Sequence, residues 1–433
     1  MNRTRLALAA MAALLSAPVG ARAREPVVGE RRVSFLDDVA IERMQHVRLR
    51  AWQPAAPYRA ARPAPPLALV TVLRDPRTHV YRMYGRAEGE PGAAVCVEGP
   101  DGVNWPGAPK ALDLPAGARA NFAPLLDANP KAPAAERYKA LAGGKALRAF
   151  GSPDGVTWRA LGDGAAIASD TPAFDCANRA LWDPLRRQYV AYVGERRDGR
   201  RVISRCTSKD FLTWTRPGPI GGALPGEQLA PGWFAVREDD STPYVALAVR
   251  VAPSGSGDVV LLSSRDGEDF GRAFPDAMVR PHGPGPWPDW RRMSPWYVQP
   301  VSRGLHTYTF MGEGALYAGG DRCCLHPAGR LSSAAAGAAE GELVTAPLTV
   351  SANVLHMDFA TGAAGWVKVE VLTPDGKPIE PYTLENAVRK TNDRHHIAEW
   401  KDHNRVELVG RRVRLRFVLK DADLYSFQFS ARK

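Results

Sequence analysis

The stretch SPDGVTW at residues 152–158 decides the fold, because the chain contains four versions of it. The other three are GPDGVNW at 99–105, SKDFLTW at 208–214 and SRDGEDF at 264–270. Their aspartates, Asp101, Asp154, Asp210 and Asp266, are 53, 56 and 56 residues apart, and a further step of 55 residues reaches Asp321. A short turn that returns at a nearly constant period indicates a repeated structural unit, so we interpret the motif as scaffold.

Strand-like runs precede each of these turns. Aromatic and β-branched residues dominate them, as in YVAYV from residue 189 and YVALAV from residue 244. The chain also holds 37 Pro and 40 Gly, which favours short strands joined by turns. Four strands per repeat and five repeats predict an all-β fold, with a five-bladed β-propeller over residues 30–340. We expect the repeated aspartate to cap a turn between outer strands and the aromatic residue four positions later to lie between blades.

The pattern changes after residue 340. From GELVTAPLTV at 341–350 onward, the chain alternates apolar and polar residues in runs such as WVKVEVL and RVRLRFVL. Such alternation is typical of half-buried antiparallel strands. Residues 341–433 therefore predict a C-terminal β-sandwich, an accessory module beside the propeller.

The first 23 residues predict an export signal. Residues 2–5 contain two arginines, residues 6–15 form a short apolar run, and Ala21-Arg22-Ala23 fits the small-x-small pattern before a cleavage site. The apolar run is short for a membrane anchor. We therefore expect a secreted or periplasmic protein that does not insert into the membrane after signal cleavage.

The net charge of +11 raises the question of a nucleic-acid partner. The arginines are dispersed over the chain and form no single basic helix or tail, so we expect no nucleic acid as partner. Attraction to an acidic polymer, or an arginine-rich composition without a specific role, accounts for the charge equally well. The oligomeric state leaves no signature in this sequence.

The cysteines and the missing motifs exclude several chemistries. The five cysteines, Cys96, Cys176, Cys206, Cys323 and Cys324, are odd in number and lack zinc-ligand spacing, so we interpret them as structural. The sequence has no phosphate-binding loop, G-x-S-x-G elbow or H-E-x-x-H motif. We expect no required cofactor or metal, although a structural Ca²⁺ in a propeller channel is compatible with the fold.

Several segments carry a resemblance to a known group of proteins. These are APAAERYKAL at 132–141, WDPLRRQYVAY at 182–192, SRCTSKDFLTWT at 204–215 and VRLRFVLKDADLYSFQF at 413–429, together with the repeated turn. They resemble exported bacterial proteins related to five-bladed β-propeller glycoside hydrolases, which include the levanase and invertase group and the arabinanase and xylosidase group. The resemblance implies a carbohydrate substrate and catalytic carboxylates near the starts of the inner strands.

Asp175 and Glu227 are the main catalytic candidates that the resemblance implies. Asp175 stands before RALWD, where such relatives hold an aspartate that orients the acid, and Glu227 stands before the apolar run from Leu229, where they hold the general acid. A general acid needs a raised pKa, so we expect the surroundings of Glu227 to raise it. For both residues, a turn cap beside a strand is the structural alternative.

A third carboxylate is less clearly indicated. Asp289 precedes the first strand of the fifth repeat, and Asp75 belongs to an R-D-P triplet that also occurs in levanase-type enzymes. Pro76 makes a plain β-turn the competing interpretation for Asp75. In the second repeat, Asn121 at the strand start and Asp127 at its far end are candidates for substrate binding.

The segment GPGPWPDWRRMSPWY at 283–297 is the candidate wall of a sugar subsite. Sugar sites use flat aromatic surfaces for stacking and planar donors for hydroxyl groups. Trp287, Trp290, Arg291 and Arg292 supply both, and a packing loop between blades is the alternative.

Two function hypotheses follow. The first is an exported glycoside hydrolase that cleaves a poly- or oligosaccharide by carboxylate acid/base catalysis at the mouth of the propeller channel. The second is a non-catalytic glycan-binding protein on the same scaffold, which is favoured by the absence of a carboxyl group at Pro65-Pro66-Leu67, before the first strand of the first repeat.

Overall fold

The computed structural model describes residues 27–28, 32–52, 67–87, 94–115, 117–176, 178–237, 242–252, 257–274, 276–278, 298–302, 313–318, 323–327, 330–391 and 396–431. Within these ranges the regular structure is β-strand, apart from one 3₁₀ turn, η1 (Ala134–Glu136). No helix there is long and apolar enough to cross a membrane. The prediction of an all-β fold is confirmed, and the predicted export signal lies outside the described residues.

Five small antiparallel sheets follow one another along the chain. The sheets consist of β5 (Leu67–Arg74), β6 (Tyr81–Ala87), β7 (Ala94–Gly99) and β8 (Lys110–Ala111); β9 (Ala123–Leu126), β10 (Tyr138–Gly143), β11 (Ala146–Ser152), β12 (Arg159–Ala160) and β13 (Ile167–Ala168); β14 (Arg179–Asp183), β15 (Gln188–Arg197), β16 (Arg200–Ser208) and β17 (Gly218–Pro219); β18 (Gln228–Ala235), β19 (Tyr244–Val251) and β20 (Gly257–Ser264); and β21 (Val298–Ser302), β22 (Glu313–Ala318) and β23 (Cys323–Pro327).

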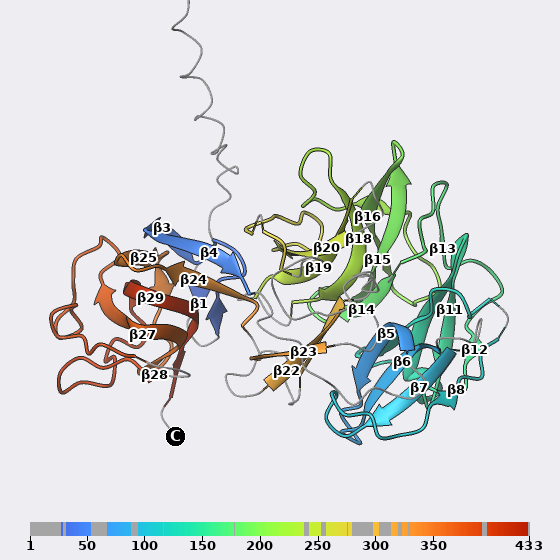
Figure 1. Cartoon of the computed structure of the whole chain (residues 1–433), viewed down its shortest axis with the longest axis horizontal. Helices are drawn as coiled ribbons and strands as arrows, with labels where there is room; N and C mark the ends of the chain where they lie inside the picture. The colour runs from blue at the N-terminus through green and yellow to red at the C-terminus, as the bar shows by residue number, and fades with distance from the viewer. Residues whose placement is uncertain are drawn as a thin grey trace, which may run out of the picture.

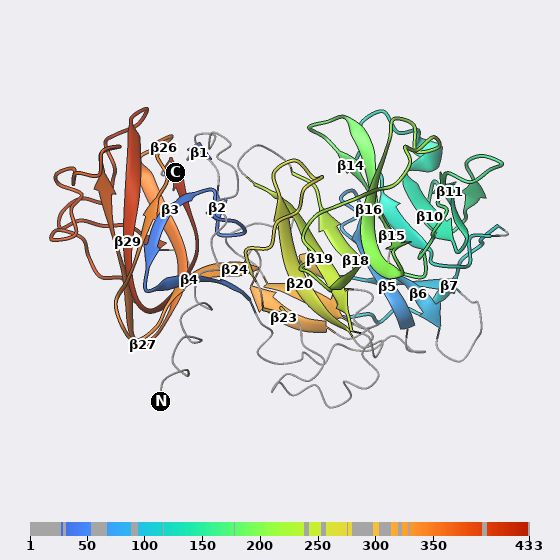
Figure 2. The ribbon, with the colours of Figure 1, turned by 90° about the horizontal axis from the view of Figure 1, so that it is seen from above.

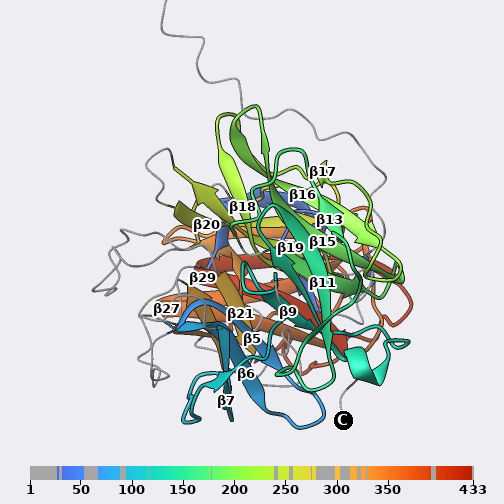
Figure 3. The same cartoon turned by 90° about the vertical axis from the view of Figure 1, so that its right-hand side faces the viewer.

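These sheets have a propeller-like arrangement (Figures 1 and 3). The first strand of each sheet contacts the first strand of the next, in the order β5, β9, β14 and β18, and β21 contacts both β18 and β5. Apolar side chains fill the space between neighbouring sheets. Tyr192 of the third sheet stacks on Phe234 of the fourth with ring centroids 4.0 Å apart, and Trp158 of the second sheet packs in one cluster with Tyr84 of the first.

The repeated turn follows the third strand in each of the first four sheets, and in the first three it leads to a short fourth strand. In the second sheet, Asp154 Oδ1 accepts hydrogen bonds from the amides of Val156 (2.8 Å) and Thr157 (2.9 Å). Equivalent pairs of amides donate to Asp101, Asp210 and Asp266. The buried Trp158 meets Phe122 edge to face. The aspartate therefore caps the turn and the aromatic residue lies in the inter-sheet core, while Asp321 lies outside the described residues.

A second repeated contact joins successive sheets. An aspartate at the end of one first strand accepts a hydrogen bond from a tyrosine in the second strand of the next sheet. The pairs are Tyr138 to Asp75 (3.1 Å), Tyr189 to Asp127 (2.7 Å) and Tyr244 to Asp183 (2.6 Å). We call these the Asp–Tyr clasps. Each clasp is a polar contact between two successive sheets, in addition to their apolar packing.

The five small sheets form one lobe of the molecule, the propeller-like lobe. The remaining strands form a second lobe, which we call the C-terminal lobe and which is built on one ten-stranded sheet (Figure 2). Its strands are β1 (Val27–Val28), β2 (Val33–Ser34), β3 (Ile41–Gln45), β4 (Val47–Ala51), β24 (Ser332–Ala336), β25 (Gly341–Thr345), β26 (Leu348–Thr349), β27 (Val354–Leu372), β28 (His396–Ile397) and β29 (Arg412–Ser430). The two 19-residue strands β27 and β29 pair with each other, with register shifts near residues 358 and 361. Their inward side chains, with Trp400, form the largest apolar cluster of this lobe.

The C-terminal lobe also contains strands from near the beginning of the chain. The strands β3 and β4, near the beginning of the chain, pair with β25 and β24, and β2 pairs with β29. An open sheet accepts further strands wherever a chain segment can reach its edge. The C-terminal lobe is therefore assembled from both parts of the sequence, which lie side by side in Figure 1.

Candidate functional site

The structure divides the predicted site residues between two ends of the small sheets. Asn121, Asp175 and Glu227 precede first strands and lie at their start end, whereas Asp75 and Asp127 directly follow first strands and lie at their far end. Asp289, Trp287, Trp290, Arg291 and Arg292 lie outside the described residues, so their roles stay predictions.

Asp175 is held by one arginine. It follows the buried Phe174 before β14, and its carboxylate oxygens accept two hydrogen bonds of 2.6 Å from the guanidinium of Arg201. This bidentate contact lowers the pKa of Asp175 below its ordinary value, against the opposing effect of burial. The side chain is still 62% exposed, so a ligand can reach this carboxylate.

Glu227 is held by two arginines and a backbone amide. Arg272 donates to it at 2.8 Å, Arg250 at 3.1 Å, and the amide of Leu224 at 2.9 Å. Burial raises the pKa of Glu227, but the hydrogen bonds from Arg272, Leu224 and Arg250 outweigh it and leave the pKa below its ordinary value. The expectation of a raised pKa is therefore wrong, because the free protein stabilises the ionised form of Glu227.

Arg201 connects the segments that carry the two carboxylates. Its guanidinium pairs with Asp175, and its backbone amide donates to the side-chain oxygen of Gln228 at 3.0 Å, next to Glu227. We call Asp175, Arg201, Glu227, Arg250 and Arg272 the acid–arginine cluster. It brings together the starts of the third and fourth sheets and alternates hydrogen-bond acceptors with planar donors, an arrangement that suits the hydroxyl groups of a sugar.

The sequence did not single out the three arginines of this cluster. They belong to strands or turns remote from the carboxylates in sequence. One signal was present for Arg250, because an antiparallel hairpin brings the end of β19 back to the start of β18, where Gln228 pairs with Val251. For Arg201 and Arg272, the sequence carried no comparable signal.

The far-end carboxylates are fully engaged by protein groups. Asp75 accepts hydrogen bonds from Arg137 (2.7 and 2.6 Å), from the Tyr138 hydroxyl and from the amide of Arg77. The Arg77 amide contact caps a turn in which the His79 amide donates to the Asp75 carbonyl at 2.8 Å, so Asp75 begins a turn as its structural interpretation requires. The Arg137 contact holds the pKa of Asp75 far below its ordinary value, against burial.

Asp127 and Asn121 are also in structural contacts. Asp127 is completely buried and accepts hydrogen bonds of 2.7 Å from both Lys139 and Tyr189. The Asn121 amide donates to the carbonyl of Gly143 at 3.0 Å and so closes the end of the β9–β10 hairpin. Neither contact presents a free polar group to a ligand.

Arg179 lies where three first strands meet. It opens β14, and its guanidinium donates to the Thr71 hydroxyl of β5 at 2.7 Å and to the Gly232 carbonyl of β18 at 3.1 Å. Only 7% of Arg179 is exposed. A buried guanidinium thus fills part of the space between the first strands, and no local pattern in the sequence predicted this.

The described cysteines and acidic groups form no further reactive centre. Cys96, Cys176 and Cys206 are free and buried, and burial raises the pKa of both Cys176 and Cys206 to about 12. Such thiols stay protonated at neutral pH and are poor nucleophiles. Among the described residues, no three His, Cys, Asp or Glu side chains are grouped as for a metal ion.

No protein-family model matches this chain, and no curated protein matches it. The solved structures to which it is similar include glycoside hydrolase β-propellers. A β-fructofuranosidase from Schwanniomyces occidentalis, complexed with fructosyl-erythritol, is 10% identical with a TM-score of 0.43, over 87% of this chain and 97% of that one. A glycoside hydrolase family 43 arabinoxylan arabinofuranohydrolase from Bacillus subtilis is 10% identical with a TM-score of 0.35, over 84% and 79%.

A third similar structure is an enzyme with a different activity. An N-acetylgalactosamine deacetylase from F. plautii, in complex with blood group B trisaccharide, is 15% identical with a TM-score of 0.40, over 86% of this chain and 95% of that one. At these identities the similarity concerns the fold alone. The reaction of this chain has to be argued from its own site residues.

Proposed function

We propose that this chain is an exported glycoside hydrolase whose small sheets close into a five-bladed propeller and whose C-terminal lobe is a β-sandwich. The contacts of β21 with both β18 and β5 support the closure, because they complete a ring of first strands. The substrate is a poly- or oligosaccharide bound at the start end of the sheets, and the reaction uses no cofactor.

The acid–arginine cluster carries the proposal. Glycoside hydrolysis needs two carboxyl groups near the scissile bond, one ionised and one protonated. Asp175 and Glu227 supply carboxyl groups before two neighbouring first strands, and Arg201 contacts both Asp175 and Gln228, the residue after Glu227. Their lowered pKa values suit the ionised role. Glu227 therefore acts as base or nucleophile, Asp175 orients the substrate, and the proton comes from a third carboxyl group, for which we retain Asp289.

The test compares hydrolysis by the wild type and by E227Q on a panel of plant, bacterial and algal polysaccharides, with release of reducing sugar as the measurement. E227Q preserves the shape of the side chain but removes its charge, and we expect the rate to fall by roughly 10²-fold or more. The matched control is E98Q, since Glu98 also pairs with two cations, Arg82 and Lys110, away from the cluster. Equal rates for wild type and E227Q would contradict the proposal.

A second candidate function is non-catalytic glycan binding. It is favoured by the complete engagement of Glu227 with Arg250, Arg272 and the Leu224 amide, which leaves the free protein without a described proton donor in the cluster. If the wild type hydrolyses no member of the panel but binds one of them, and E227Q weakens that binding, this function replaces the first.

A further inference from the structure

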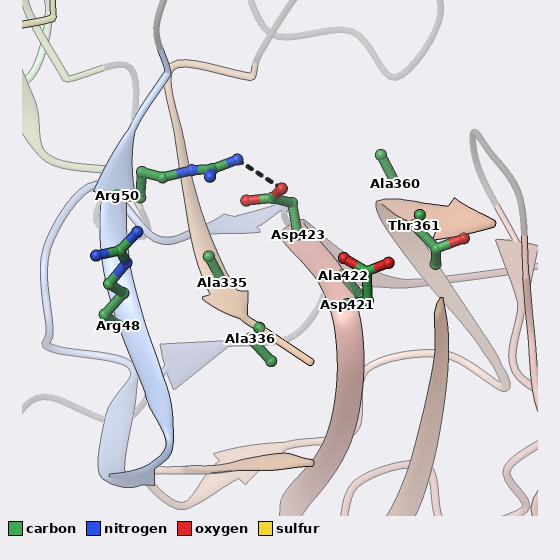
Figure 4. Close-up of a pocket in the computed structure, with 11 residues that line it drawn as sticks. Arg48, Arg50, Ala335, Ala336, Ala360, Thr361, Asp421, Ala422 and Asp423 are labelled. Atoms are coloured by element: carbon green, nitrogen blue, oxygen red, sulfur yellow. Dashed lines mark hydrogen bonds and ion pairs between the residues drawn. The ribbon is translucent and has the colours of Figure 1, made fainter. Parts of the chain in front are cut away.

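A cavity of about 350 Å³ lies on the C-terminal lobe, far along the chain from the acid–arginine cluster. The strands β4, β24, β27 and β29 form it (Figure 4). Four charged side chains line it, namely Arg48, Arg50, Asp421 and Asp423, and the remaining lining residues are small, with no aromatic ring among them. Its walls are therefore suited to hydrogen bonds and ion pairs and not to stacking.

Strand register explains why the surface is hollow here. Arg48 of β4 is opposite Ala335 of β24, Ala335 is opposite Asp423 of β29, and Asp423 is opposite Ala360 of β27. Residues directly opposite each other in an antiparallel sheet project from the same face. Short alanines therefore form a floor between charged side chains that rise on either side.

Two of the four charges neutralise each other. Arg50 pairs with Asp423 at 2.7 Å, and the Ser333 hydroxyl also donates to Asp423 at 2.6 Å. Arg48 and Asp421 are exposed, and neither side chain makes a hydrogen bond or ion pair with any residue that the structure describes. The cavity thus offers one free cation on β4 and one free anion on β29.

The backbone fixes the position of Asp421. Its φ of +44° is unusual for a residue other than glycine, and its amide donates to the Gly337 carbonyl at 2.7 Å. A Cβ atom on Gly362 would lie 1.8 Å from Asp421 Oδ2, so the carboxylate rests directly against the backbone of β27. Strained residues that are held in this way are common at ligand clamps.

We propose that this cavity binds a single acidic sugar residue, with its carboxylate on Arg48 and its hydroxyl groups on Asp421 and Asp423. A guanidinium presents a planar pair of donors that fits a carboxylate, and ionised aspartates accept hydrogen bonds from hydroxyls. The strands β4 and β29 are separated by β24 and hence by roughly 10 Å. A sugar ring can bridge such walls, whereas a small inorganic ion cannot.

The test measures binding of D-galacturonic acid and D-galactose by isothermal titration calorimetry with the full chain. We expect the acid to bind at least about tenfold more tightly than the neutral sugar, the factor that corresponds to about 1.4 kcal/mol. R48Q removes this preference, and D421N weakens both sugars. Galactose 6-sulfate is the third probe: binding equal to that of the uronic acid assigns the site to anionic sugars in general, and weaker binding assigns it to carboxylates.

Two further variants separate the site from general effects. R412Q removes an exposed arginine from the same sheet outside the cavity and should leave binding unchanged. G362A displaces Asp421 without changing any charge and should weaken binding as D421N does. Equal affinity for both sugars, no binding of either, or wild-type behaviour of R48Q would overturn the proposal. The experiment does not depend on hydrolysis, so it stands or falls separately from the proposed function.

Discussion

At the scale of the residue, the partners of each aspartate determine what it can do. Asp175 has one arginine partner and is 62% exposed, so its carboxylate can exchange that partner for a ligand. Asp75 is 6% exposed and accepts hydrogen bonds from Arg137, Tyr138 and the Arg77 amide. Asp175 precedes a first strand and Asp75 follows one, so the two look alike in sequence. Of the two, Asp175 is the one that can contact a substrate.

Asp75→Asn should destabilise the protein by about 2–4 kcal/mol, because it leaves Arg137 without its buried counter-charge. Chemical denaturation monitored by tryptophan fluorescence measures this loss. The pKa of Asp75 is lower in the folded than in the unfolded protein, so its stabilising contribution is complete above about pH 4 and is lost as the pH falls toward the folded-state pKa. The difference between wild type and D75N should therefore shrink below about pH 4.

The matched control is Asp375→Asn, at an exposed turn of the C-terminal lobe whose carboxylate contacts Lys377 at 3.3 Å. It should leave the stability of the protein nearly unchanged, because the side chain is exposed. If D75N retained full stability but lost hydrolytic activity, Asp75 would return as a catalytic candidate and the turn interpretation would be wrong.

The sequence indicated the position of the carboxylates better than their chemistry. The resemblance implied carboxylates before first strands, and Asp175 and Glu227 do lie there. The sign of the Glu227 pKa shift depends on Arg250 and Arg272, which reach it from other strands and turns. The spacing of a repeat along the sequence does not show which arginines from other strands will contact a given carboxylate in the folded protein.

At the scale of the element, the repeated turn contains a positive-φ position after each aspartate. In the first, second and fourth sheets this position is Gly102, Gly155 and Gly267, with φ of 74°, 78° and 68°. In the third sheet it is Phe211, with φ of 69°. The Phe211 ring is fully buried and meets Tyr189 and Trp214 edge to face. Burial of the ring outweighs the backbone strain at this position.

Phe211 therefore permits a test of the turn. F211A should lose about 3–5 kcal/mol of stability, because it removes the buried ring and keeps the strained backbone. F211G should be more stable than F211A by about 1 kcal/mol, because glycine adopts positive φ without strain. Denaturation midpoints of the two variants measure the difference.

Leu212 provides the comparison for this pair. It is the next residue of the same turn, is exposed, and has no positive φ. L212A should be more stable than L212G, the usual order for the two residues. If F211A were also more stable than F211G, the left-handed conformation would not be what this position requires.

The elements themselves were largely predictable, and their pairing was not. The turns and the strands β6, β10, β15 and β19 follow the aromatic and β-branched runs of the sequence. The pairing of β3 and β4 with strands nearly 300 residues later left no local signal. Alternating runs specify a strand but not the sheet edge that it joins, since every edge offers the same backbone groups.

At the scale of the whole molecule, the small sheets are coupled through polar contacts as well as through apolar packing. The Asp–Tyr clasps connect the first four sheets in sequence, each to the next. Arg179 also connects two sheets that are not consecutive, since it reaches from the third sheet to the first as well as to the fourth. This central contact links strands that no clasp joins directly.

Arg179→Met should weaken this coupling, because methionine has a similar length and cannot donate to Thr71 or Gly232. Two buried acceptors would lose their donor, at a cost of about 2–4 kcal/mol in the stability of the propeller-like lobe. We expect amide hydrogen exchange to accelerate in β5 and β18, where the lost contacts lie, and to remain unchanged in β27 and β29. Arg48→Met, an exposed arginine of the other lobe, should leave exchange in β5 and β18 as in the wild type. Uniform acceleration over both lobes in R179M would mean that Arg179 supports the molecule globally and not the junction of the first strands.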